Sequence, residues 1–362
     1  MPQINRRSFI RSAAATVGML ASFNGHNSPA SAAVLVYPRP TMRTDTVIID
    51  LNKTDTRTFQ NATYRDKHIW VIPSKSIDRR RGILFNACAS VTIIGGHFRP
   101  PVDGYARYEN GSKGDGIFTF TECKEVYLEG VLLDNIDVGR TYADGIYLNA
   151  KKANTILTMQ NCRFQNVAGV EAGFHNDILQ SGSKTMGITQ AIRIYNFSGT
   201  CDYQGFFLDP QTDPGHNPPG RVRSVTMQNV NIRRSIVITP YPRLYFWYDK
   251  ESEYTTDGGT YPTPYPIKLE NCWANSVQGT VLDAVWPSNT AGSQNQFPTQ
   301  ICRAFRVFDS ATGRHYAHWP NMMGYKKAIS DLSGKVPGRI WEGDPPSGDF
   351  VPESMVGLNY RI

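Results

Sequence analysis

The chain has 362 residues and a formal net charge of +7, from 38 Lys and Arg against 31 Asp and Glu. No run approaches the roughly 20 apolar positions that a membrane-spanning helix requires, which argues against a membrane span. The modest basic excess suits an anionic partner. The one dense basic run, residues 79–81, is interpreted as a solvated turn, so nucleic acid is not an expected partner.

Residues 1–32 are predicted to be an export signal. Paired Arg6 and Arg7 precede a weakly apolar stretch that ends at Ala30-Ser31-Ala32, which fits an A-x-A cleavage site. These three parts, in this order, are typical of a twin-arginine signal peptide. The mature chain would then begin near Ala33 and be periplasmic or secreted.

Residues 33–80 contain two strand-like runs, 47–49 and 69–72. They precede a region of repeats that begins near residue 81. A stacked repeat array needs its ends covered, so this segment is predicted to be an N-terminal cap.

Residues 81–290 carry a recurring phrase: aliphatic, any residue, aliphatic, any residue, then Gly or Asn. The phrase ends every 31 to 42 residues, at Gly95, Gly130, Asn161, Asn196, Asn229 and Asn271. Gly and Asn adopt a left-handed backbone most easily, so each marks a corner between two strands. The residue after each corner is nearly always apolar. The pattern predicts coils of parallel strands stacked about 4.8 Å apart.

A second column of residues completes each coil. Asp115, Asp144 and Asp177 each precede a further aliphatic strand, at nearly the same period. Each coil therefore has three short strands. The pattern resembles the right-handed parallel β-helix of the pectate-lyase-like superfamily, which includes polysaccharide lyases and polygalacturonase-type hydrolases. The expected fold is all-β: a single right-handed parallel β-helix over residues 81–290, with a C-terminal cap at 291–362.

The six cysteines are judged by their place in the coils. Cys162 and Cys272 both follow a corner Asn and are expected in the core. Three coil steps would separate them by about 14 Å, beyond the limit of about 7 Å for a disulfide. The sequence leaves open whether disulfides form among the other four cysteines, Cys88, Cys123, Cys201 and Cys302. The sequence contains no Cys-x-x-Cys pair, so a structural zinc site is not expected.

The resemblance implies a substrate groove along the strand that follows each Asp. Strand alternation predicts Ile117, Ile146 and Leu179 inward, and it predicts Phe118, Tyr147 and Gln180 outward. The three aspartates are expected to form an outward column at the strand entrance. They could hold Ca²⁺, act as an acid/base pair on a glycoside, or share a proton beside a uronate. The alternative is simple turn chemistry before a strand.

His175 and Asp177 lie two residues apart and would share a strand face. With Asp144 they form the expected catalytic set, because imidazole and carboxylate groups are common acid/base catalysts. Tyr147 and Gln180 are expected to bind substrate. Loop residues that border the same face extend the substrate-binding set to Asp209, Arg221, Tyr241 and Arg243. Ca²⁺ at Asp115, Asp144 and Asp177 is the candidate cofactor.

These features predict an exported enzyme that cleaves an acidic polysaccharide by β-elimination. A glycoside hydrolase on the same fold is the first alternative, favoured by the carboxylate column. A uronate epimerase and a non-catalytic polysaccharide-binding or adhesion scaffold are the others, since fold alone does not settle function. The sequence leaves the sugar, the linkage and the oligomeric state open.

Overall fold

The chain divides into two units, Met1–Ser31 and Ala32–Ile362. The computed structural model describes residues 34–79, 82–99, 116–134, 144–150, 154–167, 176–181, 188–201, 204–208, 224–234, 245–248, 267–276, 279, 281, 305–318 and 339–361. All of these residues belong to the second unit.

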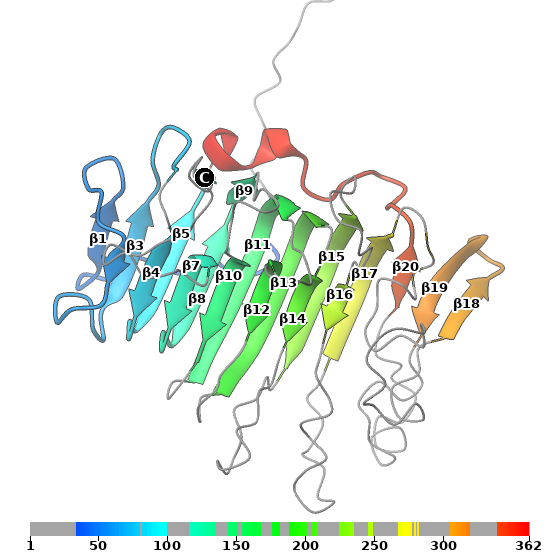
Figure 1. Ribbon diagram of the computed structural model, residues 1–362, viewed down its shortest axis with the longest axis horizontal. Helices are drawn as coiled ribbons and strands as arrows, with labels where there is room; N and C mark the ends of the chain where they lie inside the picture. The colour runs from blue at the N-terminus through cyan, green and yellow to red at the C-terminus, as the bar shows by residue number, and fades with distance from the viewer. Residues whose placement is uncertain are drawn as a thin grey trace, which may run out of the picture. The chain divides into compact units, whose positions relative to one another are not determined.

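Two large sheets make up the described part of the second unit (Figure 1). The 13-stranded sheet contains β1 (Val47–Asp50), β3 (His68–Ile72), β5 (Ser90–Ile94), β6 (His97–Phe98), β8 (Glu125–Glu129), β9 (Leu132–Asp134), β11 (Asn154–Val167), β13 (Ile188–Cys201), β15 (Val225–Arg234), β17 (Ile267–Asn275), β18 (Phe305–Asp309), β19 (Arg314–His318) and β20 (Ile340–Glu342). The 7-stranded sheet contains β2 (Thr58–Phe59), β4 (Ile83–Asn86), β7 (Gly116–Thr121), β10 (Asp144–Asn149), β12 (Asp177–Ser181), β14 (Gln204–Leu208) and β16 (Tyr245–Tyr248).

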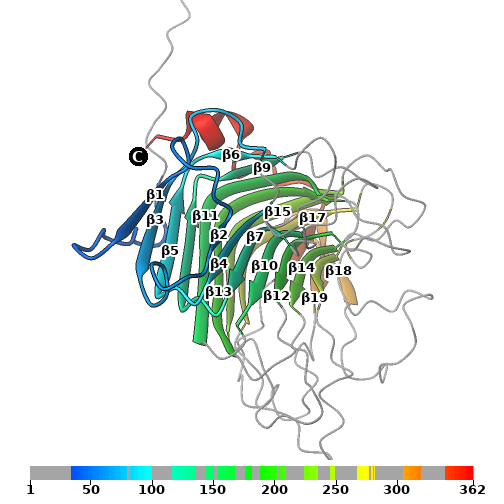
Figure 2. The ribbon, with the colours of Figure 1, turned by 60° about the vertical axis from the view of Figure 1, so that its left-hand side comes forward.

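From β2 to β17 the chain alternates between the two sheets, which face each other as layers in Figure 2. Neighbouring strands within each sheet are parallel, apart from the antiparallel pairs of β19 with β18 and with β20. The core lies between the layers. Strand alternation fills it with aliphatic side chains and with a stack of Phe59, Phe85 and Phe120, whose ring centroids are 5.2 and 5.5 Å apart. The prediction of an all-β, mostly parallel fold is confirmed.

The predicted corner residues form one column. All six have positive φ, from 46° at Asn196 to 74° at Gly95. The asparagines also bond to one another along the stack. Asn196 Nδ2 donates to Asn161 Oδ1 at 2.9 Å, Asn229 to Asn196 at 2.9 Å, and Asn271 to Asn229 at 2.7 Å. The corner prediction is therefore confirmed, and the Asn side chains add an amide ladder.

The cysteines that follow corners are buried, as predicted. Cys162 and Cys272 are fully enclosed, and burial raises the pKa of each thiol to about 12. Cys88, Cys123 and Cys201 are also buried, and none of these five forms a disulfide. Cys302 lies outside the described residues.

The segment predicted as an N-terminal cap contributes strands to both sheets. β1 and β3 begin the larger sheet and β2 begins the smaller one, and each is parallel to the next strand of its own sheet. At the other end of the larger sheet, β20 pairs with β17, and β19 and β18 extend the sheet with antiparallel strands.

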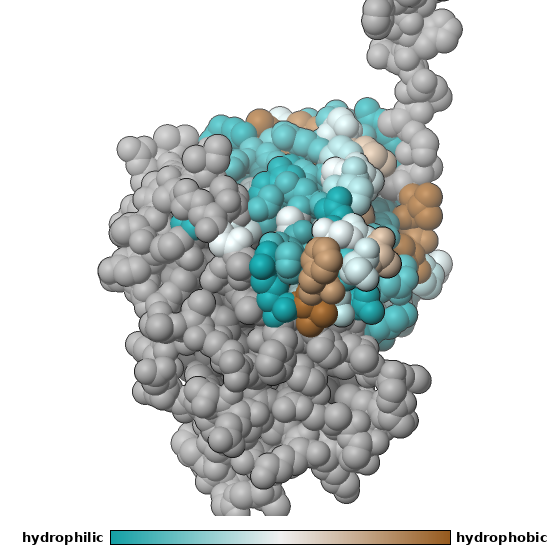
Figure 3. Space-filling view, turned by 90° about the vertical axis from the view of Figure 1, so that its right-hand side faces the viewer, coloured by the Kyte–Doolittle hydropathy of each residue, from teal (hydrophilic) through white to brown (hydrophobic). Residues whose placement is uncertain are grey.

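Figure 3 shows the side of the molecule that includes these last strands. The described surface there is mostly hydrophilic, with small hydrophobic patches.

Two terminal segments lie across the strands of the larger sheet. The N-terminal segment, residues 34–46, precedes β1. The C-terminal segment, residues 343–361, includes the 3₁₀ turns η3 (Glu353–Met355) and η4 (Gly357–Asn359) and runs from β17 back to β8 (Figure 1). Within the described ranges no helix has the length and apolar character needed to cross a membrane.

Candidate functional site

The outer face of the 7-stranded sheet carries an in-register row of side chains. Leu84, Thr119, Tyr147 and Gln180 are direct Cα partners on β4, β7, β10 and β12. They alternate with the core residues Ile146 and Leu179 along their strands. Leu84, Tyr147 and Gln180 are partly exposed. Thr119 is buried, with 2% of its surface exposed. The row therefore presents the phenol of Tyr147 and the amide of Gln180 on adjacent strands, as the sequence predicts.

The register of β7 corrects one part of the prediction. Phe118, predicted outward, is fully buried and is the Cα partner of Ile146, while Thr119 takes the place opposite Tyr147. Gly116, rather than Asp115, aligns with Asp144. The shift is one residue, and a one-residue shift moves every side chain to the opposite face.

Asp144 and Asp177 are buried, with 3% and 1% of their surface exposed. The sequence predicts an outward column, which the burial contradicts. Asp144 and Asp177 open β10 and β12 and share strand parity with the core residues Ile146 and Leu179. Asp144 Oδ1 accepts a 2.9 Å hydrogen bond from the backbone N–H of Asp177. Asp144 therefore links β10 to the start of β12. The catalytic roles of both residues stay predictions.

Most other residues of the predicted site lie outside the described ranges. They are Asp115, His175, Asp209, Arg221, Tyr241 and Arg243. Among the described residues, no group of three His, Cys, Asp or Glu side chains is placed to hold a metal ion. Ca²⁺ at Asp115, Asp144 and Asp177 therefore stays a prediction.

A His–Arg–Asp cluster, in which the aspartate is buried and the other two side chains are partly exposed, lies at the ends of β6 and β9. Asp134 Oδ2 accepts from Arg99 Nε at 3.0 Å, His97 Nε2 lies 3.6 Å from the same oxygen, and Asn166 Nδ2 donates to Oδ1 at 3.0 Å. Burial raises the pKa of Asp134, but the bonds from His97 and Arg99 outweigh it and hold that pKa well below its usual range. Asp134 is thus a fixed anion, suited to orienting its neighbours rather than to exchanging a proton.

Glu129 is the centre of a second buried network. Its carboxylate accepts from Arg39 on the N-terminal segment, from Tyr127 on β8, and from the Tyr360 hydroxyl at 2.6 Å. Burial raises the pKa of Glu129, but the hydrogen bonds from Arg39, Tyr127 and Tyr360 hold it below its ordinary value. In turn, burial and the carboxylate raise the pKa of Tyr127 and Tyr360. Such a paired, fully bonded carboxylate has a structural role.

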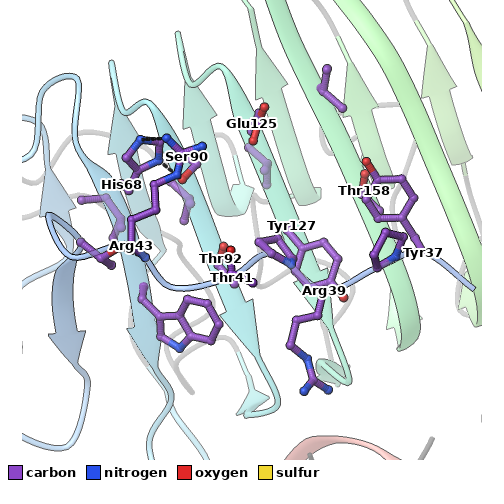
Figure 4. A pocket seen from close by; sticks show the side chains of 18 of the residues that line it. Tyr37, Arg39, Thr41, Arg43, His68, Ser90, Thr92, Glu125, Tyr127 and Thr158 are labelled. Carbon is purple, nitrogen blue, oxygen red and sulfur yellow. Dashed lines mark hydrogen bonds between the residues drawn. The ribbon is translucent and has the colours of Figure 1, made fainter. Parts of the chain in front are cut away.

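A cavity of about 370 Å³ lies between the N-terminal segment and the outer face of the 13-stranded sheet (Figure 4). Residues 37–41, Arg43 and Thr46 form its roof. Its floor comes from β3, β5, β8 and β11, and Figure 4 shows the segment crossing these strands. The floor side chains include Trp70, Thr92, Tyr127 and Thr158. This cavity is on the opposite sheet from the predicted groove.

Sequence reasoning missed both the Glu129 network and the cavity. Part of the signal is present, since the position before each corner is outward and holds Ile94, Glu129, Gln160, Tyr195, Gln228 and Glu270. A glutamate at an outward strand position is normally expected to face solvent. Only the return of residues 39 and 360 to the same place buries it.

Comparison of the chain with protein-family models, with curated proteins and with solved structures gave no match. A function must therefore be inferred from the residues of this chain and their geometry.

Proposed function

We propose that this protein is an exported enzyme that cleaves an acidic, uronate-containing polysaccharide by β-elimination. We also propose that its parallel sheets form a single right-handed β-helix of the pectate-lyase-like kind. The predicted twin-arginine signal at residues 1–32 supports export to the periplasm or beyond. The substrate would lie across the outer face of the 7-stranded sheet.

The observation that carries this proposal is the row of Cα partners Leu84, Thr119, Tyr147 and Gln180, all partly exposed except the buried Thr119. An extended polymer that lies perpendicular to the strands would pass successive positions of this row at steps of about 4.8 Å. A phenol ring can stack on a sugar face, and an amide group can bond its hydroxyls. The backbone register of the row continues to Phe207 on β14.

The chemistry requires two proton transfers. A base removes the proton beside the uronate carboxylate, and an acid gives a proton to the departing glycosidic oxygen as the double bond forms. The proposed acid/base set is His175, Asp177 and Asp144. It is supported by the sequence pattern. Asp209, Arg221, Tyr241 and Arg243 are proposed to bind the substrate from the bordering loops.

A glycoside hydrolase is the second candidate, and one observation favours it. Asp144 and Asp177 open adjacent parallel strands and are joined through a backbone hydrogen bond. Two carboxyl groups on neighbouring strands can share a proton, and hydrolases use such pairs as acid and base or nucleophile.

Incubation with a panel of acidic polysaccharides separates these functions. A lyase raises both the ultraviolet absorbance of an unsaturated uronate and the number of reducing ends. Reducing ends alone indicate a hydrolase. If neither the absorbance nor the number of reducing ends rises, both cleavage proposals are contradicted, and an epimerase or a binding scaffold is left. The activity is expected in the periplasmic or secreted fraction of the cells.

Variants then test the residues. His175→Ala and Asp177→Asn are each expected to lower turnover by at least about 100-fold, the scale for loss of a general acid or base. Glu270→Gln, on β17 of the opposite sheet, is the control and should leave turnover unchanged. Melting temperature reports folding, which matters because Asp177 is buried. Full activity in both folded variants would move the chemistry away from the start of β12.

A further inference from the structure

We propose that the cavity beneath the N-terminal segment is a binding site for a small saccharide of one or two sugar units. It lies on the 13-stranded sheet, so the proposal is independent of the polysaccharide-cleaving activity proposed for the other face. Three features of the cavity support it: the way the segment holds it open, the unpartnered hydroxyl groups in its floor, and the polar groups at its rim.

The N-terminal segment is fixed at both ends and leaves its middle unattached. At one end, Gln160 Oε1 accepts from the backbone N–H groups of Val36 and Tyr37 at 3.1 Å, and Arg39 pairs with Glu129. At the other end, Arg43 Nη1 contacts His68 Nε2 at 3.0 Å. Between Arg39 and Arg43, Pro40 has no N–H to give. The segment therefore bridges the sheet and holds the cavity open.

Two threonine hydroxyl groups in the floor have no hydrogen-bond partner within the described part of the chain. They belong to Thr92 on β5 and Thr158 on β11, two residues that are each only 3% exposed. Both residues line the cavity, and their hydroxyls open into it rather than into the closed core. Polar groups in a largely buried pocket are usually hydrogen-bonded. A bound molecule with its own hydroxyl groups would pair with both.

The arrangement of the floor matches a sugar. Thr92, Tyr127 and Thr158 are consecutive Cα partners on β5, β8 and β11, so the tyrosine ring lies between the two hydroxyls. Trp70, the Cα partner of Thr92 on β3, extends the aromatic surface. Aromatic rings pack on the apolar face of a sugar while hydroxyls bond its edge. At about 370 Å³ the cavity is near the small end of ligand pockets, which limits the ligand to one or two units.

The rim supplies a donor and an acceptor. Arg43 always donates, so its contact with His68 Nε2 makes that nitrogen the acceptor and places the imidazole proton on Nδ1. His68 Nδ1 then donates to Ser90 Oγ at 2.8 Å, which leaves the Ser90 hydroxyl proton free to donate to a ligand. Glu125, exposed at the rim, can accept. Because the Nε2 lone pair of His68 is occupied, this trio binds and does not activate Ser90 as a nucleophile.

Calorimetry with galactose, galacturonic acid and digalacturonic acid tests the proposal, with glycerol as a small-polyol control. At least one of the sugars should bind to the purified protein, and glycerol should not. Thr92→Val and Thr158→Val remove a hydroxyl at nearly constant volume, and each should weaken binding by about fivefold. Thr226→Val is the matched control, since Thr226 lies in the same row on β15 but outside the cavity.

Two results would overturn the proposal: no sugar binds to the wild-type protein, or the Thr92 and Thr158 variants bind as well as Thr226→Val does. If the threonine variants fail to fold, two further variants decide. Ser90→Ala changes only the partly exposed rim and should weaken binding several-fold. Binding should also change the tryptophan fluorescence of the wild type but not that of Trp70→Phe. An unaffected Ser90→Ala together with an unchanged Trp70 signal would place any bound sugar elsewhere.

Discussion

At the residue scale, the corner asparagines do two separate things. Their left-handed backbone turns the chain between strands, with φ of 54° at Asn229. Their side chains bond along the stack, so Asn229 both donates to Asn196 and accepts from Asn271. A glycine can serve the first purpose but not the second, which explains why the ladder includes only the asparagines.

Asn229→Val should lower the free energy of unfolding by about 1–2 kcal/mol, because a β-branched residue is disfavoured in the left-handed region. Asn229→Gly keeps the backbone conformation and loses only the ladder bonds, so it should cost less. Urea unfolding of both variants gives the comparison. Equal stability of Asn229→Val and wild type would contradict the corner assignment.

Glu129 makes stability depend on pH. Its pKa in the folded protein lies below the ordinary value of 4.5. The ionised Glu129 carboxylate therefore contributes fully to the free energy of unfolding above about pH 4.5, and this contribution is lost as the pH falls through the folded-state pKa. Glu129→Gln should be less stable than wild type at neutral pH by about 3 kcal/mol, since it leaves Arg39 without its partner. Between about pH 5 and pH 2 the difference should shrink.

Thermal unfolding across that pH range measures the effect, with the exposed Glu125→Gln on the same strand as control. The control should follow the wild-type curve throughout. A constant gap between wild type and Glu129→Gln at every pH would show that the carboxylate charge contributes nothing.

At the element scale, the two terminal segments differ in how they are held. The C-terminal segment is anchored repeatedly. Asp349 accepts from Arg163 at 2.8 Å and from Asn231 at 2.9 Å, and the Val351 N–H donates to Ser198 at 2.9 Å. The N-terminal segment has one described ion pair, Arg39 with Glu129, and is otherwise held by hydrogen bonds, among them those of Gln160 with Tyr37 and of Arg193 with Tyr37. Its docking should therefore be easier to disturb.

Arg39→Met keeps much of the side-chain length and removes the charge. Hydrogen exchange of residues 36–46 should become at least about tenfold faster in this variant, while β5, β8 and β11 stay protected, because local segments open independently of the core strands. Arg43→Met, at the exposed end of the segment, is the control and should have a smaller effect on residues 36–39. Unchanged exchange in Arg39→Met would mean that the remaining hydrogen bonds, such as those of Gln160 and Arg193 with Tyr37, are enough to hold the segment.

At the scale of the whole molecule, residues near both ends of the described chain bond one carboxylate on β8. Arg39 and Tyr360 each bond Glu129, though they lie at opposite ends of the described chain. Tyr360 also packs over Gly130, where any side chain would collide with its ring. The corner at residue 130 is therefore a glycine because the C-terminal segment covers it.

The effects of Arg39→Met and Tyr360→Phe on the free energy of unfolding should not be additive, because residues that share a partner couple by about 0.5 kcal/mol or more. A double-mutant cycle by urea unfolding measures the coupling. Asp309→Asn, in the β18–β19 hairpin, combined with Arg39→Met should be additive. Additivity in both cycles would show that the two ends are held separately.

The sequence by itself determined the corners, the recurrence of the parallel strands and the buried cysteines. These depend on local rules, because a left-handed corner admits few residue types and strand alternation repeats every two residues. It also placed Tyr147 and Gln180 on one outer row. It failed at Phe118, where one residue of register changed the face, and at Asp144 and Asp177, which are buried.

Only the tertiary structure decided the Glu129 network and the cavity. Residues 39, 129 and 360 carry no local signal for one another, and their meeting depends on how both chain ends fold back over the larger sheet. The unpartnered hydroxyls of Thr92 and Thr158 arise in the same way, since the N-terminal segment covers them without bonding to them. Contacts between distant parts of the chain depend on the path of the backbone, which no local sequence pattern specifies.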